Sequence, residues 1–532
     1  NIYEGGNMAA LASLINRRIN MSRKKGHSLS TGGSFNQSIL FQGYRILSLD
    51  LFGNYNNRHD ECFNHYDINF GKNPTPAESA TRYFKNHPDL DYNLGSRLSY
   101  SFSVGRGQSL TLSYQYKRNY RKGTSDLVLL ETPESVEDFM SGILPSVINY
   151  ESTLDRSNSY LSRQTDDDHM VMLGYRYSKK MKNGKDLYIQ ADFPLTLANR
   201  KLEYQRGTVD TIFTRRTILL DLRQAILNIG DSFEGPYVYS FYIRRLQSQA
   251  PDMVKMIDFM DTTDPLYIVK GNKNLKNALQ ADFGLNYRYI NKERRMVAGG
   301  ALDFFILSNA LSQGYTYDTE TGIREGSFYN INGNWNMKGS LFYNQQFNNG
   351  FTLDNQFTAG HATSVDLIGE NSPQLFRSKV YNLNFADRLN LEYRFAKHRL
   401  SLDVSAQYDR YSSNRTDFTE QNTWTIKSGI NAVLELPANF QLATDMTVYT
   451  RRGYTDELLN TDNYVWNARL TYRALKGKLL LSLDGYDILH DLSNVSYTMN
   501  AQARTETYRT VLPRYAMFRM QWLFNHSPKS KK

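Results

Sequence analysis

The sequence has almost no cysteine and no long hydrophobic run. No segment approaches the roughly 18 apolar residues that a transmembrane helix needs, and the mean hydropathy of the 532 residues is -0.57. A helical membrane protein is therefore excluded. Cys62 is the only cysteine, which excludes a disulfide framework and leaves the cellular compartment open.

Charge of one sign does not accumulate along the chain, although the formal net charge is +10. Lysine and arginine are interspersed with aspartate and glutamate, and the sequence has no basic helix or stripe. Nucleic acid is therefore not an expected partner. Solvated loops and a charged interior wall account for the excess of basic residues.

The sequence is rich in aromatic residues, with 38 Tyr and 28 Phe, and it alternates between apolar and polar positions. The clearest case is 381–411, where two arms are joined by 396–398. In the second arm, every second residue is apolar: Leu400, Leu402, Val404, Ala406 and Tyr408. A period of two is typical of a strand with one apolar face.

The length of these arms favours a membrane. A soluble hairpin shows the same alternation when its apolar face lies in a core, but such strands usually have about five or six residues. About ten tilted residues are needed to cross the hydrocarbon of a bilayer, and both arms are long enough. We therefore interpret 381–411 as two membrane-crossing strands with one face toward lipid and one toward water.

The alternation persists from about residue 28 to residue 524, whereas a soluble chain of this length would normally divide into distinct domains. Short links alternate with long ones, and the short links are 291–295, 348–350, 396–398, 437–439 and 475–478. Transmembrane barrels sort their loops in this way, with short periplasmic turns and long outer loops. The sequence therefore predicts an all-β fold, a closed transmembrane antiparallel β-barrel of about 20–22 strands.

Three divisions of the chain follow from the pattern. Residues 1–27 form an N-terminal segment that includes a partial strand, residues 28–524 form the outer-membrane barrel, and residues 525–532 form a basic tail. About nineteen strands are clear, and barrels of this type have even numbers of strands. We therefore expect further strands before Asn1.

Several connections are predicted to leave the sheet. Residues 58–91 are expected to be a long loop because Pro74, Pro76 and Pro88 interrupt them. Residues 121–167 are expected to be the longest loop, with a short lid helix at 134–144. A helical turn is predicted at 253–260, a single strand at 328–347 and a last long connection at 490–513.

Short motifs resemble a known family. DPLYIVKGNKNLKN at 264–277, followed by LQADFGLNYRY, is similar to a loop-to-strand signature of TonB-dependent receptor barrels. LDGYDILHDLSN and LPRYAMFRMQWLF resemble the closing segments of that family, and 154–160 and 330–335 look like its Bacteroides-type branch. The resemblance covers most of the chain from about residue 28. It implies a place in the bacterial outer membrane and a role in nutrient import.

The sequence departs from the family in two ways. The Lys-Pro-Glu of the signature is replaced by Lys276, Asn277 and Ala278, and a basic tail follows Phe524. No compact mixed α/β segment resembling the family's plug precedes the strands. TonB is therefore an expected partner only if a plug lies upstream of Asn1.

Two groups of polar residues could bind a metal ion, and two histidines could take part in catalysis. One outer segment could hold a transition metal, and its candidate ligands are His59, Asp60, Glu61, Cys62, His65 and Asp67. Asp166, Asp167 and Asp168 could hold Ca²⁺. A polar loop explains both groups more simply, so we expect no metal and no cofactor. His169 and His398 lie near serines without a coherent catalytic arrangement, so we expect no catalytic residues and no enzyme activity.

Charged side chains are predicted on the face that lines the lumen. They are Arg288, Arg388, Arg394, Arg399, Asp403 and Asp409. Contact with a polar substrate or a plug explains them, and so does hydration of a water-filled wall.

Two functions remain open at this stage. The first is import across the outer membrane of a nutrient such as a glycan, a peptide or a metal chelate. The second is a structural or docking barrel that has lost transport. Its partners would be surface lipoproteins or other subunits of an outer-membrane complex. Outer-membrane lipids are expected partners in both cases.

Overall fold

Among the residues that the computed structural model describes, 25 strands form one sheet, and two further strands form a separate hairpin. The structure describes residues 2–3, 14–70, 78–130, 150–182, 185–222, 225–231, 237–264, 266–318, 323–370, 374–415, 418–454, 457–492, 495–499, 504–508 and 514–524. Within these residues, no helix is long and apolar enough to cross a membrane.

Most of the sheet is a wall of long strands, each antiparallel to the next. The first are β2 (Leu14–Phe41), β3 (Arg45–Phe70), β4 (Glu78–Gly105), β5 (Gln108–Leu130), β6 (Tyr160–Lys180), β7 (Lys185–Arg206), β8 (Val209–Leu220), β9 (Ala225–Asp231) and β10 (Tyr237–Gln249). The later ones are β13 (Ala278–Asn291), β14 (Met296–Ser308), β17 (Asn334–Gln346), β18 (Phe351–Glu370), β19 (Phe376–Phe395), β20 (His398–Ser413), β21 (Gln421–Leu436), β22 (Phe440–Arg452), β23 (Asp462–Ala474), β24 (Leu479–Tyr486) and β27 (Tyr515–Trp522). Both β8 and β9 pair with β7, so they act as one interrupted strand.

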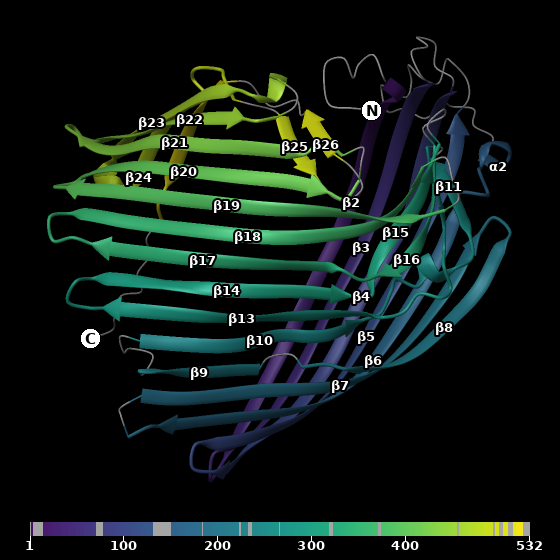
Figure 1. Cartoon of the computed structure of the whole chain (residues 1–532), viewed down its shortest axis with the longest axis horizontal. Helices are drawn as coiled ribbons and strands as arrows, with labels where there is room; N and C mark the ends of the chain where they lie inside the picture. Colours follow the sequence, from purple (N-terminus) through teal and green to yellow (C-terminus); the bar gives the residue numbers. More distant parts are fainter. Residues whose placement is uncertain are drawn as a thin grey trace.

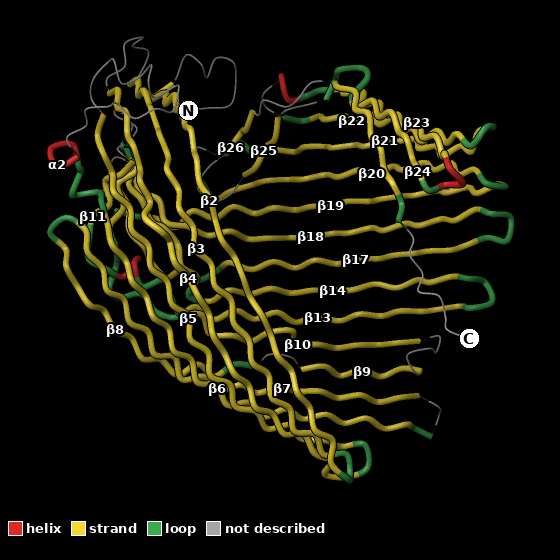
Figure 2. The backbone as a smooth tube through the Cα atoms, turned by 180° about the vertical axis from the view of Figure 1, so that it is seen from behind, coloured by secondary structure: helices red, strands yellow, loops and turns green. Residues whose placement is uncertain are grey.

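The wall is strongly curved. In Figure 1 the early strands β2 to β7 run obliquely behind the later strands, and Figure 2 shows the same crossing from the other side. The sheet therefore bends round an interior, as a barrel wall does. This observation confirms the predicted all-β antiparallel barrel fold.

Shorter elements leave the wall. They are β1 (Ile2–Tyr3), α2 (Tyr150–Thr153), η2 (Val254–Met256), β11 (Met260–Asp264), β12 (Tyr267–Lys270), β15 (Ala310–Tyr317), β16 (Arg324–Ile331), η3 (Glu457–Leu459), η4 (Leu475–Gly477), β25 (Val495–Met499) and β26 (Arg504–Tyr508). β12 pairs in parallel with β16, and β15 pairs in parallel with β18. The excursion between β10 and β13 is therefore tied to the excursion between β14 and β17, and through it to the wall.

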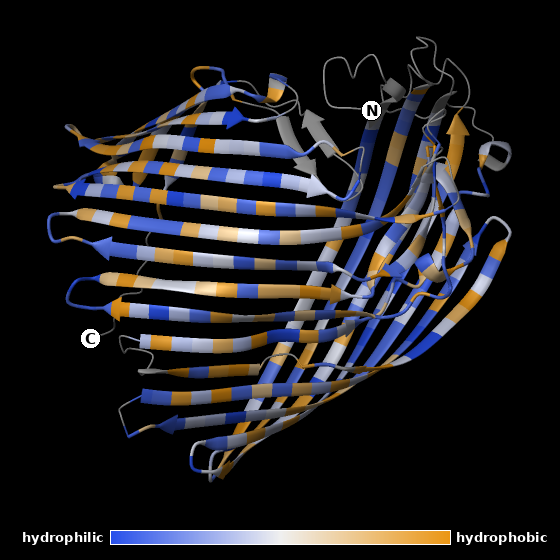
Figure 3. Cartoon of the chain, in the orientation of Figure 1, coloured by the Kyte–Doolittle hydropathy of each residue, from blue (hydrophilic) through white to orange (hydrophobic). Residues whose placement is uncertain are grey.

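The two-residue alternation separates two faces. In the β19–β20 ladder, Leu391 lies opposite Leu402 and Asn390 lies opposite Asp403, so like side chains share a face. Figure 3 shows the alternating colours along these strands. Leu402 is 38% exposed although it is apolar. Lipid is the solvent that such a face requires, and the polar face is turned to the interior.

Loop length divides the two ends of the wall. Tight turns close one end, and several of them use positive φ, such as Ala396 at 50° and Asn439 at 63°. All the shorter elements except η4 lie at the opposite end, which we call the long-loop end. Buried apolar clusters lie at the long-loop end, including Phe63, Tyr83 and Val128.

Two expected loops are wrong in extent. Residues 58–91 belong largely to β3 and β4, and the second expected loop is shorter at both ends, because residues 121–130 belong to β5 and residues 160–167 belong to β6. Pro88 is tolerated because it lies at the register shift between His87 and Leu90, where a ladder hydrogen bond is not required. The outer ends of these strands carry polar residues on both faces, so their sequence reads like a loop. The backbone pairing of the strands nevertheless continues beyond the membrane. The lid helix predicted at 134–144, with Pro74 and Pro76, lies outside the described residues.

The single strand predicted at 328–347 is also wrong, because it is divided into β16 and β17. The break contains Gly333, whose φ of 111° is a conformation that few other residues adopt. The expected helical turn at 253–260 is confirmed by η2. The expected last connection at 490–513 contains the hairpin of β25 and β26.

The two edges of the wall are β2 and β27. Within the described residues, β2 pairs with β1 and β3, and β27 pairs with β24. Both edge strands run from the long-loop end toward the tight turns, so they cannot close an antiparallel ladder by pairing directly with each other. Within the described residues, the two edges of the wall are therefore not joined to each other.

Candidate functional site

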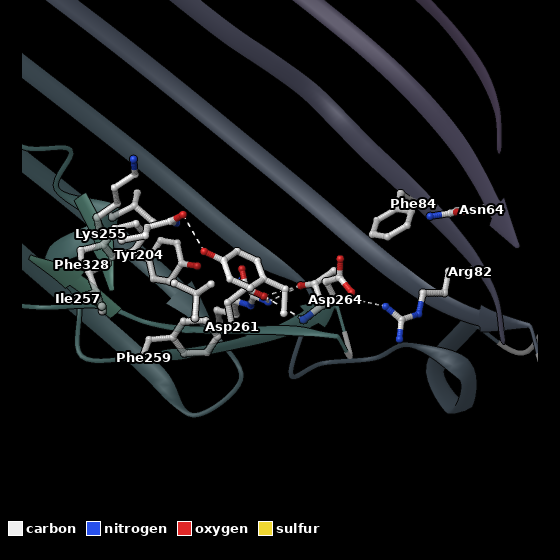
Figure 4. Close-up of a pocket in the computed structure, with 17 residues that line it drawn as sticks. Asn64, Arg82, Phe84, Tyr204, Lys255, Ile257, Phe259, Asp261, Asp264 and Phe328 are labelled. Carbon is white, nitrogen blue, oxygen red and sulfur yellow. Dashed lines mark hydrogen bonds and ion pairs between the residues drawn. The ribbon is translucent and has the colours of Figure 1, made fainter. Parts of the chain in front are cut away.

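A cavity of about 440 Å³ lies at the long-loop end, between the wall and the two excursions. The wall contributes Asn64 from β3, Arg82 from β4 and Arg206 from β7. Residues 254–271 close the opposite side, and Figure 4 shows their side chains grouped against those of the wall. The cavity is therefore built from segments that are far apart in the sequence.

Apolar packing holds the excursion in place. Met253 and Ile257 pack on Leu202 and Tyr204 of β7, and all four side chains are buried. These two β7 residues alternate with the exposed apolar residues of the same strand, so they lie on its inner face. The excursion therefore folds inward and narrows the interior at this end.

Arg206 fixes the excursion to the wall. Its Nη2 donates to Asp261 Oδ1 at 2.7 Å, to Thr263 Oγ1 at 2.7 Å and to Asn158 Oδ1 at 2.8 Å. Its guanidinium carbon lies 4.5 Å from the centre of the Phe259 ring. A nearly buried cation requires such partners, so Arg206 is a structural anchor rather than a free ligand.

The same contacts set the protonation of Asp261. Burial by itself would raise the pKa of this carboxyl, but the hydrogen bonds from Arg206 and Thr263 outweigh it and hold the pKa below its usual value. Asp261 therefore stays ionised and cancels the charge of Arg206. The ion pair of Arg206 and Asp261 has no net charge, so it does not attract a charged ligand.

Arg82 and Asn64 are two polar residues of the cavity that each keep an unpaired atom. They lie directly opposite each other in the β3–β4 ladder. Arg82 donates through Nη1 to the carbonyl oxygen of Thr263, whereas its buried Nε has no hydrogen-bond partner. The buried Oδ1 of Asn64 also has none. An unpaired buried polar atom costs about 1–3 kcal/mol, so both side chains carry an unmet hydrogen-bonding capacity beside the cavity.

Aromatic and cationic groups complete the lining. Lys255 Nζ lies 5.1 Å from the centre of the Phe328 ring, and Tyr267 Oη donates to Gln313 Oε1 at 2.7 Å. Burial raises the pKa of Tyr267, which therefore stays neutral. Phe84 also faces the cavity (Figure 4). The arrangement suits a ligand with a flat apolar part and hydrogen-bonding or negatively charged groups.

The charged residues predicted for the lumen do not form one site. On β20, Asp403 accepts from Asn390 at 2.7 Å and from Asn431 at 2.8 Å, and Arg388 Nη2 lies 3.9 Å from its Oδ1. Asp409 accepts from Asn384 at 2.7 Å.

The other predicted lumen residues lie elsewhere on the wall. Arg394 and Arg399 lie opposite each other beside a tight turn, and Arg288 lies apart on β13. The structure brings together only Arg388 and Asp403 as an ion pair. Their role toward a substrate stays a prediction.

The candidate metal ligands at 59–67 lie on β3, where successive side chains point to opposite faces of the sheet. His65 contacts Thr81 at 2.9 Å and Asp67 at 3.5 Å, whereas Asp60 forms ion pairs with Lys24 and Arg58. In the described part of the chain, no three His, Cys, Asp or Glu side chains converge as metal ligands. Asp166 and Asp168 both contact Arg200, which occupies the position that a cation would need.

Sequence reasoning missed the cavity and its central residues, Arg82, Arg206 and Asn64. Each stands in a polar stretch without a motif, and only the folding of the excursion brings them together. One signal was available, because the motif at 264–277 supplies Asp264, Tyr267 and further residues to the lining.

Comparison with known sequences shows the protein family to which the strands of the wall belong. The sequence model of the outer membrane protein beta-barrel family matches residues 237–522, more than half of the chain. The chain belongs to this family. This barrel is therefore a protein of the bacterial outer membrane, and its tight turns and long loops mark the two ends of an outer-membrane wall. The predicted resemblance is confirmed at the level of the barrel.

The barrel is also similar to solved structures, and no curated protein matches its sequence. The copper transporter OprC is 10% identical with a TM-score of 0.43, over 95% of this chain and 80% of that chain. The ferric yersiniabactin uptake receptor FyuA from Yersinia pestis is 10% identical with a TM-score of 0.40, over 94% and 79%. FpvA from P. aeruginosa, bound to heterologous pyoverdines, is 6% identical with a TM-score of 0.42, over 94% and 71%.

Proposed function

We propose that this barrel imports a nutrient across the outer membrane, in the manner of a TonB-dependent receptor, and that the cavity of Arg82 and Asn64 captures the nutrient at the long-loop end. Arg82 and Asn64, which line a cavity on the inner side of the wall and each keep one buried polar atom without a hydrogen-bond partner, carry the proposal. The motif at 264–277, which resembles the receptor signature, supports it by lining the same cavity.

The chemistry of the cavity narrows the nutrient to a class. Lys255 and Arg82 supply positive charge and Asp264 supplies negative charge, whereas the charges of Arg206 and Asp261 cancel. Phe84 and Phe328 supply flat apolar surfaces. A glycan, peptide or metal chelate that carries both acceptors and donors meets these requirements. The predicted lumen residues would then line the route beyond the cavity.

The test compares growth when one nutrient is limiting. A strain lacking the gene is complemented with the natural full-length protein or with its Asn64→Leu/Arg82→Met variant, and growth is measured on panels of glycans, peptides and metal chelates. We expect the deletion to abolish growth on one class. We expect the variant to raise the nutrient concentration for half-maximal growth about tenfold or more, because two hydrogen bonds are lost.

A Lys397→Met variant serves as the control, since Lys397 is an exposed residue of the tight turn between β19 and β20, at the end of the wall opposite the cavity. Folding of all variants is checked by their heat-modifiable migration in electrophoresis. If the deletion leaves growth on every nutrient unchanged but prevents surface lipoproteins from co-purifying with their complex, the barrel is a docking protein and import is wrong.

A further inference from the structure

The outward face of β5 to β8 carries a basic cluster directly beyond its apolar belt. The last row of the belt consists of residues that lie opposite one another on successive strands: Tyr116, His169, Leu197 and Ile218. Toward the long-loop end the next row consists of Arg118, Asp167, Asn199 and Arg216. The row beyond the belt is therefore polar on all four strands and charged on three of them.

These strands form a shallow cavity of about 950 Å³, and half of its lining residues are arginine or lysine. We call its five outward-facing cations the basic cluster, and they are Arg118, Lys122, Arg163, Lys201 and Arg216. Alternation places all of them on the side of the exposed Val171 and Leu197. The cluster therefore faces away from the lumen and cannot belong to the import route.

Only part of this positive charge is neutralised. Asp167 lies 3.6 Å from Arg118, whereas Glu203 is shared by Arg163 at 3.6 Å and Lys201 at 2.7 Å. Across the described residues, no carboxylate is within ion-pair distance of Lys122 or Arg216. The cluster thus keeps an excess of positive charge.

Cations at the same end of the opposite wall are paired. Arg410 lies 2.8 Å from Glu420, and Arg452 lies 2.6 Å from Asp462. Arg452 lies opposite the exposed Trp424, so it also follows the edge of the apolar belt. An excess of positive charge is therefore not required at this height of the barrel, and the excess on β5 to β8 calls for an anionic partner.

The position of the cluster identifies where that partner comes from. Between Gln108, at a tight turn, and Tyr116, β5 covers about 21 Å of depth, for a rise of about 3.4 Å per residue and a tilt of about 40°. Such a span matches the roughly 25 Å of an outer-membrane barrel's apolar band. Arg118 and Lys122 therefore lie at the level of the lipid headgroups, on the outer side of the membrane.

We propose that the basic cluster binds the phosphorylated headgroup of a glycolipid of the outer leaflet. Arginine and lysine are suited to phosphate oxygens. In such a complex, Lys122 and Arg216 pair with phosphate, and Tyr120, Asn199 and Thr214 offer hydrogen bonds to sugar hydroxyls from the same cavity. The acyl chains lie on the apolar belt below.

The test uses purified, folded full-length protein in neutral detergent. Binding of diphosphorylated lipid A is measured by native mass spectrometry, with phosphatase-treated lipid A as a second probe and inorganic phosphate as a competitor. We expect the Lys122→Gln/Arg216→Gln variant to bind lipid A roughly thirtyfold more weakly, because two surface cations are lost. Phosphatase-treated lipid A should bind the natural protein as weakly as the intact lipid binds the variant.

The matched control is Arg410→Gln/Arg452→Gln, which removes two paired cations at the same height, and it should bind lipid A like the natural protein. Equal loss in both variants, or equal binding of intact and phosphatase-treated lipid A, would overturn the proposal. Displacement of the lipid by equimolar inorganic phosphate would also overturn it, because the site would then bind free phosphate. Import through the interior is not involved in any of these measurements.

Discussion

At the scale of single residues, the face of β20 on which a side chain lies determines the free-energy cost of placing a charge there. Leu402 and Asp403 are adjacent in sequence, but Leu402 lies in an exposed apolar row that includes Ile430 and Met446. Asp403 lies on the other face and accepts hydrogen bonds from two asparagine side chains. The same substitution at these two positions should therefore have opposite consequences.

We expect Leu402→Arg to impair assembly in the membrane, because a lipid-facing arginine near the bilayer centre costs about 2–4 kcal/mol. Asp403→Arg should be tolerated, since its side chain can extend into water beside the largely exposed Arg388. The yield of heat-modifiable folded protein measures both effects. Equal yields from the two variants would contradict the assignment of the faces.

Residue type alone does not reveal which charges are free. Arg206 and Arg216 stand ten positions apart on a β7–β8 hairpin, yet one is enclosed by Asp261, Thr263 and Asn158 and the other has no acidic partner among the described residues. Register and the folding of a distant excursion produce the difference. Register and loop folding also explain why Arg82 keeps an unpaired atom, whereas the candidate metal ligands His65 and Asp60 have partners on neighbouring strands.

At the scale of elements, the excursion between β10 and β13 behaves as a small packed unit on the wall. Met256, Leu275 and Phe328 form a buried cluster that joins η2 to β16. This cluster is separate from the ladder hydrogen bonds that hold the wall strands. The excursion can therefore loosen without disrupting the barrel.

We expect Met256→Ala to destabilise the excursion by about 2–5 kcal/mol, since it leaves a cavity in a buried cluster. Hydrogen exchange of the β11 and β12 amides should become faster, whereas exchange in β19 and β20 should not change. Val254→Ala, at an exposed position of the same helical turn, is the control. A variant in which β19 and β20 also exchange faster would show that excursion and wall unfold together.

At the scale of the whole molecule, the position of the tryptophans reports the contact with lipid. All four lie on the exposed face: Trp335, Trp424, Trp466 and Trp522. Trp522 lies near the tight turns, and Trp335 and Trp424 lie toward the long-loop end. Aromatic residues of this kind form the girdles at the two edges of an outer-membrane barrel.

We expect lipids brominated near the headgroup to quench the tryptophan fluorescence of the reconstituted barrel strongly, and lipids brominated near the chain ends to quench it less. A water-soluble quencher should have a smaller effect than in the unfolded protein. Fluorescence that brominated lipids leave unchanged, or a chain that stays soluble without detergent, would show that the apolar face does not contact acyl chains.

Much of the wall was predictable because each strand carries its own evidence. The apolar rows, the tight turns and the helical turn at η2 depend on local period and local turn chemistry. The extent of β3 to β6 was not predictable, since strands that leave the membrane lose their apolar face and read as loops. The split of 328–347 depends on a single glycine, Gly333, within a continuous alternation.

The sequence by itself determined the β architecture, the two faces of each strand and the membrane environment, because alternation and strand length are local properties that solvent selects directly. Only the tertiary structure decided which polar groups meet. Arg82, Asn64 and the loop that carries Asp261 come from distant segments, and the basic cluster spans four strands. Cross-strand register and loop folding fix those contacts, and neither is written in the spacing of residues along one strand.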